Sequence, residues 1–231
     1  MGIMNKKKLI LIITSCLYPN TFDTDLPIKF DSIEKRIKRY IHTIKKLDIE
    51  IFDKVYFIDN SIYDVKDFKN LYEIISQKQI ILVNFTPSKF SHTRGKGFQE
   101  AEMINHILKN FGENTKFFKI TGTIPIKNIS KSIKIIDRKS KSNYFLFSTY
   151  ISNLTRIVDT RFFFTNKKTW FYFRKYYQQF INDKNNIYIE HALFIFSKAF
   201  RIKLQMFYPN IENKNFIMGD GKIYKNPKVN Y

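Results

Sequence analysis

Short apolar runs alternate with amphipathic segments through the first half of this chain, and this alternation restricts the fold more than any other feature. The apolar runs are Leu9 to Thr14, Lys54 to Ile58, Gln79 to Phe85 and Lys116 to Ile120. Each is continuous and rich in β-branched or aromatic residues, which is typical of strands buried on both faces. Between them, residues 33–47, 67–76 and 98–111 place apolar side chains at helical spacing. The pattern predicts an α/β fold, a Rossmann-type domain with a mostly parallel central sheet flanked by helices.

The second half of the chain has weaker signals. We expect strands at 144–148 and 162–164, a short helix at 133–137, and longer helices at 169–180 and 187–200. The tail after Tyr208 has no clear period. A length of 231 residues without an internal repeat or a linker fits one domain covering residues 1–231.

The charge balance favours anionic partners. Forty Lys and Arg face twenty Asp and Glu, giving a formal net charge of +20. Phosphates, nucleic acid and an anionic membrane surface are the partner classes that such a charge attracts. The abundance of Lys, Asn, Ile and Phe with only seven Gly is also typical of a genome rich in A and T, which accounts for part of the excess.

Cysteine use and hydropathy indicate where such a chain works. Cys16 is the only cysteine, so the chain forms no internal disulfide and no cysteine-based zinc site, which suits a reducing compartment. The four His are too scattered to suggest a metal cluster. No apolar stretch approaches the roughly 20 residues that span a bilayer. We therefore expect a cytoplasmic protein whose membrane association, if any, is peripheral on the inner face of the cytoplasmic membrane.

Polar segments follow several of the predicted strands. Ligands of open α/β sheets bind beyond the carboxyl ends of the strands. We therefore expect four segments to converge there, namely 15–20, 59–61, 94–97 and 119–123.

Five motifs in these and later segments carry a resemblance to a known family. They are the loop Thr14 to Pro19, Asp59 within IDNS, Gly95-Lys96-Gly97 before FQEAEMINHIL, the KITGT segment, and Glu190 within IYIEHALF. In this order they resemble the GT-A class of glycosyltransferases, and more closely small bacterial enzymes that build capsule or lipopolysaccharide. The resemblance covers Leu9 to about Phe194. It implies a nucleotide-binding part at about 1–125 and an acceptor-binding part at about 126–231.

The resemblance also implies a nucleotide-sugar donor and a set of residues to bind it. Together with the positive charge and hydrogen-bond donors that a diphosphate needs, it gives as candidates Thr14, Ser15, Asp59, Arg94, Lys96, Lys119, Thr121, Gly122 and Arg161. Many GT-A enzymes hold a divalent cation with Asp-x-Asp after the fourth strand, whereas this chain has Thr121, Gly122 and Thr123 there. Metal use is therefore left open, with no metal ligand assigned. Lys119, Arg94 and Lys96 could supply the positive charge that a departing diphosphate needs.

Several of these residues have a structural alternative. Lys96 between its glycines fits either a phosphate at a helix N-terminus or a solvated basic turn. Asp59 fits either a donor contact or an Asx-turn that closes a strand. Arg161 fits either a bidentate diphosphate contact or a surface ion pair with Asp159.

Glu190 is the candidate catalytic base, with Asp159 in reserve. Its apolar neighbours suit a carboxylate that deprotonates an acceptor hydroxyl, and the outcome is then inversion at the sugar. The alternative is a glutamate that interacts with a helix dipole. The aromatic segment TWFYFRKYY fits the core, an acceptor-stacking platform or a lipid-facing patch.

The expected function is sugar transfer from a nucleotide-sugar to a growing surface polysaccharide or lipooligosaccharide, a glycan or glycolipid acceptor. One alternative is a basic nucleic-acid-binding protein, but no zinc spacing or RNP-like signature supports it. The other is a sugar nucleotidyltransferase, but SCLYPN stands where a glycine-rich, arginine-containing loop is expected. The donor, the linkage and the oligomeric state are not specified by the sequence.

Overall fold

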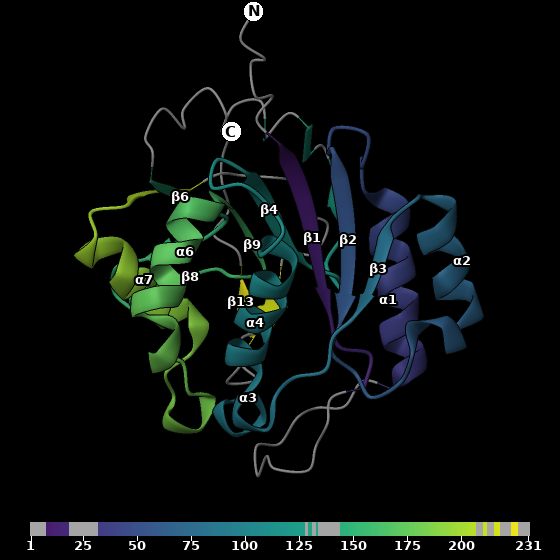
Figure 1. Ribbon diagram of the computed structural model, residues 1–231, viewed down its shortest axis with the longest axis horizontal. Helices are drawn as coiled ribbons and strands as arrows, with labels where there is room; N and C mark the ends of the chain where they lie inside the picture. The colour runs from purple at the N-terminus through teal and green to yellow at the C-terminus, as the bar shows by residue number, and fades with distance from the viewer. Residues whose placement is uncertain are drawn as a thin grey trace, which may run out of the picture.

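A seven-stranded mixed sheet forms the centre of the molecule (Figure 1). The computed structural model describes residues 8–18, 32–127, 129–130, 133, 144–206, 210–211, 215–217 and 223–225. The strand order is β10-β6-β9-β4-β1-β2-β3. The strands are β1 (Leu9–Ser15), β2 (Lys54–Asp59), β3 (Ile81–Asn84), β4 (Lys116–Thr121), β6 (Phe145–Ser148), β9 (Phe162–Asn166) and β10 (Lys203–Met206).

The four strands predicted from the first half of the chain all run parallel. β1 pairs with β2 on one side and with β4 on the other, and β3 extends the sheet beyond β2. β9 runs antiparallel to both β4 and β6, with Phe162 opposite Ile120. The prediction of a mostly parallel sheet within an α/β fold is confirmed. The antiparallel β9 has one important consequence, because the residues that precede it lie at the carboxyl end of β4.

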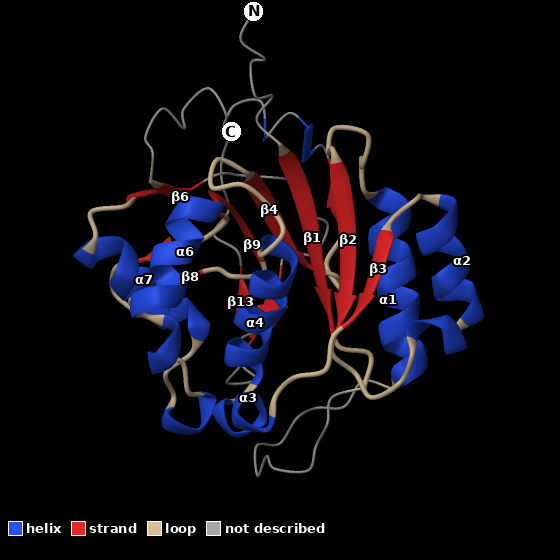
Figure 2. Ribbon diagram, viewed as in Figure 1, coloured by secondary structure: helices blue, strands red, loops and turns tan. Residues whose placement is uncertain are grey.

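Helices cover both faces of the sheet, as Figure 2 shows. They are α1 (Ile33–Lys46), α2 (Lys69–Gln77), α3 (Lys89–Arg94), α4 (Lys96–Leu108), α6 (Lys167–Tyr176) and α7 (Ile189–Ala199). Within the described residues, single 3₁₀ turns lie at Val65–Asp67, Gln178–Phe180 and Asp183–Asn185.

The core is divided between the two faces of the sheet because side chains alternate along β1. Leu11 and Ile13 pack in the cluster that contains α1 and α2, whereas Ile10 and Ile12 pack in the cluster that contains α4, α6 and α7. Burial on both faces explains why the strand reads as a continuous apolar run.

Some element boundaries differ from the predicted ones. The predicted helix 98–111 starts earlier, at Lys96, and the separate short helix α3 precedes it. The predicted helix 169–180 is α6 followed by a 3₁₀ turn, and β10 had no sequence signal. Of the predicted helix 133–137, only residue 133 belongs to the described residues, and residues 19–20 of the first predicted loop also lie outside them.

Short strand pairs complete the described structure. β5 (Ile126–Lys127) pairs with β11 (Asn210–Ile211), β7 (Ile151–Ser152) with β8 (Ile157–Val158), and β12 (Asn215–Ile217) with β13 (Ile223–Lys225). The tail therefore contributes strands although it shows no periodicity. Within the part of the chain that the structure describes, no helix combines the length and the apolar character that crossing a membrane requires.

Candidate active site

The carboxyl ends of β1 and β4 mark the point where the sheet changes direction. From β1 the chain builds outward through β2 to β3, and β4 then returns to the other side of β1. Open α/β sheets bind ligands at such a switch point. The amide of Gly122 donates to the carbonyl of Thr14 (3.0 Å), so the segments that follow the two strands remain in contact.

Lys119 on β4 is the centre of a polar network at this edge. Its side chain is fully buried, and its Nζ lies 2.6 Å from Oε1 of Glu100 on α4. The same ammonium donates to the carbonyl of Thr160 (2.6 Å) and to Oγ1 of Thr121 (3.0 Å). These three partners match the three donors of an ammonium group. Lys119 is thus engaged within the protein, and a direct diphosphate contact would require it to exchange a partner.

Glu100 connects the network to β1. The Thr14 hydroxyl donates to Glu100 Oε1 at 2.8 Å. Thr14 is buried at the end of β1, whereas Glu100 retains 19% of its side-chain exposure. The contacts of Glu100 therefore join β1, α4 and β4 at one point.

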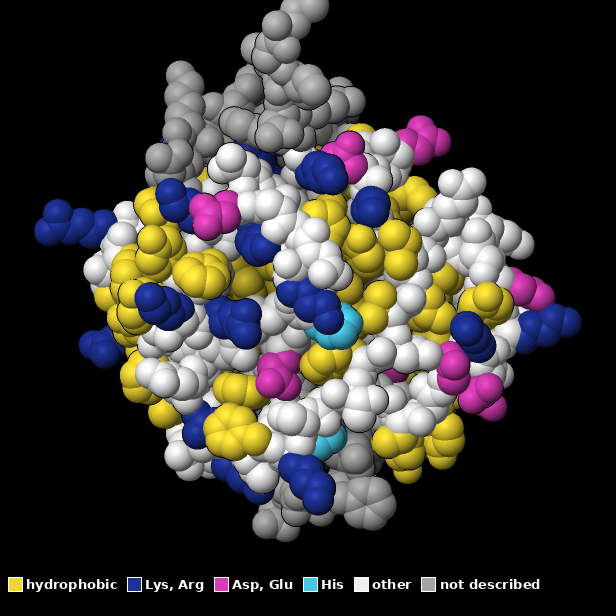
Figure 3. All heavy atoms as spheres, in the orientation of Figure 1, with side chains coloured by type: hydrophobic (Ala, Val, Ile, Leu, Met, Phe, Trp, Pro, Cys, Tyr) yellow, Lys and Arg dark blue, Asp and Glu magenta, His cyan; other side chains and the backbone are white. Residues whose placement is uncertain are grey.

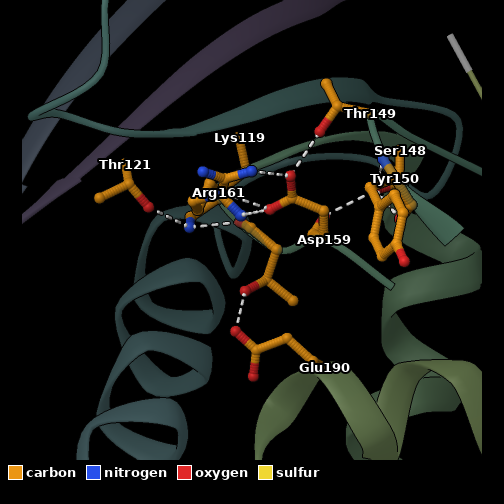
Figure 4. Close-up of polar contacts among 9 residues, drawn as sticks. Lys119, Thr121, Ser148, Thr149, Tyr150, Asp159, Arg161 and Glu190 are labelled. Carbon is orange, nitrogen blue, oxygen red and sulfur yellow. Dashed lines mark hydrogen bonds and ion pairs between the residues drawn. The ribbon is translucent and has the colours of Figure 1, made fainter. Parts of the chain in front are cut away.

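Thr160 extends the network to Glu190, which Figure 4 shows together with Lys119, Thr121 and Asp159. The Thr160 hydroxyl donates to Glu190 Oε1 at 2.8 Å, while its carbonyl accepts from Lys119. Glu190 lies in the first turn of α7. Withdrawal from water raises the pKa of Glu190 to about 7, and the hydrogen bond from Thr160 limits the rise. A carboxyl with this pKa exchanges protons near neutral pH.

Asp159 and Arg161 form a closed ion pair beside Thr160. Asp159 Oδ1 accepts from the amide and Nε of Arg161 (2.9 and 2.8 Å), and Oδ2 accepts from Arg161 Nη2 (2.6 Å). The Thr149 hydroxyl also donates to Oδ2 (2.6 Å). Asp159 and Arg161 thus form the ion pair that was one of the two alternatives for Arg161. Because Asp159 accepts four hydrogen bonds, its carboxylate is poorly placed to accept a proton from a substrate.

Asp59 links the loops that follow β1 and β2. Its Oδ2 accepts from the Ser15 hydroxyl (2.6 Å) and the Leu17 amide (3.1 Å). Its Oδ1 accepts from the Ser61 amide (2.8 Å), which is the Asx-turn geometry. Asp59 is 1% exposed. These contacts make it a positioning residue for both loops, and its proposed donor contact stays a prediction.

Gly122 is required by close packing against α1. A Cβ at this position would lie 2.7 Å from Tyr40 Cδ1 and 3.0 Å from Ile13 Cγ2. The Tyr40 hydroxyl accepts from the Cys16 amide (3.0 Å), and Arg36 donates to the Cys16 carbonyl (2.8 Å). Burial raises the pKa of the Cys16 thiol to about 12, so this cysteine is an inert part of the loop.

The start of α4 is occupied by a carboxylate from a distant segment. Asp183 Oδ2 accepts from the Gly97 amide at 3.1 Å, and a Cβ on Gly95 would lie 2.6 Å from Asp183 Cβ. Desolvation raises the pKa of Asp183. An internal anion thus lies at the helix N-terminus, where a bound phosphate was one of the two alternatives for the Lys96 segment.

Arg94 and Lys96 flank this helix start and differ in their surroundings. Arg94 donates to the carbonyls of Gln179 and Ile181, so the fold itself employs its guanidinium. Lys96 is exposed, unlike Arg94, Lys119 and Arg161. The loop that follows β2 contacts α4 nearby, because the side-chain amide of Asn60 donates to Gln99 Oε1 (2.8 Å).

The residues at the end of β4 do not fit a divalent cation. Thr121 and Gly122 offer hydroxyl and backbone groups where carboxylates would suit such an ion. Among the described residues, no group of three or more His, Cys, Asp and Glu could hold a metal.

Comparison with known proteins identifies the fold. No family model and no curated protein matches the sequence. A crystal structure from Desulfovibrio desulfuricans G20, described as a nucleotide-diphospho-sugar transferase, is similar with a TM-score of 0.53, 7% identity and coverage of 88% of this chain and 80% of that one. The chain has a GT-A-like fold. At this identity the likeness concerns the fold alone.

Two further solved structures show weaker similarity. A glycosyltransferase involved in the glycosylation of the major capsid of PBCV-1 has a TM-score of 0.45 and 10% identity, covering 87% of this chain and 81% of that one. Mouse xyloside xylosyltransferase 1 in its apo form has a TM-score of 0.48 and 7% identity, covering 87% and 84%.

Three residues of the candidate active site lacked a functional assignment from sequence. Glu100, Thr160 and Asp183 each form contacts with residues at least 19 positions away in the chain. One signal for Glu100 was present, because Lys119 within an apolar strand requires a buried carboxylate as its partner. Nothing local indicated which acidic residue that would be.

Proposed function

We propose that this protein is a glycosyltransferase that moves a sugar from a nucleotide-sugar donor to a growing surface polysaccharide or lipooligosaccharide. The main support is the chain of contacts from Lys119 through Thr160 to Glu190 at the carboxyl edge of the sheet. The GT-A-like fold supports the same function class. The acceptor class rests on the resemblance of the sequence motifs.

Glu190 serves as the general base in this proposal. Its carboxylate takes the proton from an acceptor hydroxyl while the acceptor oxygen bonds to the anomeric carbon of the donor sugar. The bond from that carbon to the diphosphate breaks in the same step, and the nucleoside diphosphate leaves with the bonding electrons. Attack from the face opposite the leaving group gives inversion. A pKa of about 7 suits this role because the carboxylate is ionised, yet basic, near neutral pH.

The fixed charges around Glu190 have a positioning role. Lys119 holds the Thr160 backbone, and the Thr160 hydroxyl then orients the Glu190 carboxylate. Lys96 is the candidate for the leaving diphosphate, because this exposed residue lies at the start of α4 beside the loop that follows β1, where partial desolvation lowers its pKa. A cation there stabilises the charge that develops on the departing phosphate.

Substitution of Glu190 by Gln tests the proposal. Glu190→Gln keeps the shape of the side chain and removes its basicity, so we expect donor affinity within about twofold and transfer lowered by about 10²–10⁴. The control is Glu73→Gln on α2, a carboxylate with 50% side-chain exposure that is outside the network. The assay follows release of the nucleotide, which is the nucleoside diphosphate from UDP-, GDP- or dTDP-sugars and CMP from CMP-sugars, each with and without manganese. Full turnover by Glu190→Gln would remove the base assignment, and a protein that binds none of these donors would remove the function.

A further inference from the structure

The outer face of α6 combines aromatic rings with lysines. Lys168, Phe171, Tyr172, Lys175 and Tyr176 are spaced so that they share one side of this helix, over an arc of about 140°. Phe171 is 49% exposed and Tyr176 is 39% exposed. Trp170 and Phe173 on the opposite side are buried and supply the packing against the sheet. The exposed rings are therefore not needed to fill the core.

The end of α7 adds a further ring to this surface. Phe200 is 42% exposed, and its ring centroid lies 5.5 Å from that of Tyr176 and 6.3 Å from that of Tyr172. Lys175 Nζ lies 5.1 Å from the Tyr176 ring centroid, and Lys168 Nζ lies 5.1 Å from that of Tyr144. We call the set Lys168, Phe171, Tyr172, Lys175, Tyr176 and Phe200 the aromatic–lysine face.

The segment of residues 167–203, which contains α6 and α7, is strongly basic. Its basic residues are Lys167, Lys168, Arg174, Lys175, Lys184, Lys198, Arg201 and Lys203. The acidic residues in this stretch are Asp183 and Glu190, which hydrogen-bond to Gly97 and Thr160 inside the protein. In Figure 3, basic and hydrophobic side chains are interspersed on the side of the molecule where Figure 1 places α6 and α7. This side therefore presents apolar area and positive charge together.

The aromatic–lysine face is separate from the candidate active site. Glu190 lies in the first turn of α7, and Phe200 follows its last residue. Eleven helical residues span about 16 Å. Substitutions in this face thus leave the network around Lys119 and Glu190 untouched.

We propose that the aromatic–lysine face docks on an anionic lipid bilayer. Aromatic rings at an interfacial helix enter the headgroup boundary, while lysines beside them attract anionic headgroups. A second copy of this chain is a poorer match, because lysine is depleted in protein–protein interfaces and like charges would oppose each other. Single-stranded nucleic acid stacks its bases on free ring faces, whereas Tyr172, Tyr176 and Phe200 stack on one another.

Vesicle sedimentation tests this proposal without using donor or acceptor, so its outcome is independent of the transferase activity. The full chain is mixed with vesicles of phosphatidylcholine alone or of equimolar phosphatidylcholine and phosphatidylglycerol. We expect binding to the anionic vesicles that weakens with salt. The double variant Lys168→Gln/Lys175→Gln should bind about 30-fold more weakly, because each lysine near an anionic surface contributes roughly fivefold. Phe171→Ser/Phe200→Ser should also weaken binding while the folded circular dichroism spectrum is retained.

Matched substitutions on another side of the molecule complete the test. Lys66→Gln/Lys69→Gln removes the same charge from exposed positions beside and on α2, and should leave vesicle binding within about threefold of the unchanged chain. The proposal would be overturned if Lys66→Gln/Lys69→Gln weakened vesicle binding as much as Lys168→Gln/Lys175→Gln does. It would also be overturned if the unchanged chain did not bind anionic vesicles. Preferential binding of a single-stranded RNA that needs the same lysines would assign the face to nucleic acid instead. A dimer in light scattering that dissociates in the Phe171→Ser/Phe200→Ser variant would assign it to a second copy.

Discussion

At the scale of single residues, the buried charge of Lys119 determines much of the site. An ammonium in a fully buried strand position is tolerated when a carboxylate and further acceptors surround it. Glu100, Thr121 and Thr160 supply these partners, and they come from α4, β4 and the segment before β9. One residue type at one strand position thus fixes the relative placement of three segments.

Removal of the Lys119 charge should therefore destabilise the protein. Lys119→Met leaves Glu100 without its cation, and we expect a loss of about 3 kcal/mol in the free energy of unfolding, measured by urea titration. The double variant Lys119→Met/Glu100→Gln should recover part of this loss because no unpaired charge remains. A single variant as stable as the unchanged protein would show that the ion pair has little energetic importance.

The hydrogen bond from Thr160 to Glu190 should influence the pH dependence of transfer. Glu190 has a raised pKa of about 7, so activity that needs its ionised form rises as the pH increases through that value. Thr160→Val removes a donor that favours the carboxylate and should move this acidic limb to higher pH. A pH profile of kcat/KM checks the shift, with Thr155→Val on an exposed turn as the control. If the acidic limb of the profile does not move in Thr160→Val, Thr160 does not influence the pKa of the base.

The same pKa has a consequence for stability. A carboxyl whose folded-state pKa is raised favours folding while it is protonated, and this contribution is lost as the pH rises from its ordinary pKa of 4.5 through about 7. The ionised carboxylate that the proposed chemistry needs therefore carries a stability cost at neutral pH.

At the scale of elements, the junction of α3 and α4 is the most constrained feature of the site. Gly95 has a φ of 101°, a region that residues with a side chain rarely adopt, and the Asp183 side chain fills the space that a Cβ would need. Asp183 contacts this helix start although it follows Gly97 by 86 residues in the sequence. The junction thus connects the first half of the fold to the second.

Gly95→Ala should consequently weaken the fold. We expect a loss of about 2–4 kcal/mol from the combined backbone strain and contact with Asp183, measured by thermal or urea unfolding. Gly112→Ala is the matched control, because nothing lies within 4 Å of a Cβ at that position. Similar behaviour of the two variants would mean that the Gly95 junction relaxes easily.

At the scale of the whole molecule, the sheet brings segments from all parts of the described chain to one edge. β1, β2 and β4 deliver their carboxyl ends there, and antiparallel β9 brings the residues that precede it to the same edge. α4 contributes Glu100 to the network, and the first turn of α7 contributes Glu190. A ligand at this edge would contact both halves of the fold at once.

Binding of the right donor should therefore raise the thermal stability of the whole chain. At a hundred times its dissociation constant, a ligand of the folded state contributes about 2.7 kcal/mol, which corresponds to a rise of roughly 5–10 °C in Tm for a domain of this size. A thermal-shift series over nucleotide-sugars measures it. Free monosaccharides, which lack the diphosphate, serve as the control, and a rise with them alone would contradict a donor site at this edge.

The sequence by itself determined the layered α/β architecture, because buried strands and amphipathic helices leave local periodic patterns. It also identified Asp59, Lys119 and Glu190 as polar residues near strand or helix ends. Only the tertiary structure decided that Glu100 pairs with Lys119, that Asp183 lies at the start of α4, and that β9 runs antiparallel. These features depend on which distant segments meet, and hydrophobic periodicity records the burial of a residue without recording its partner.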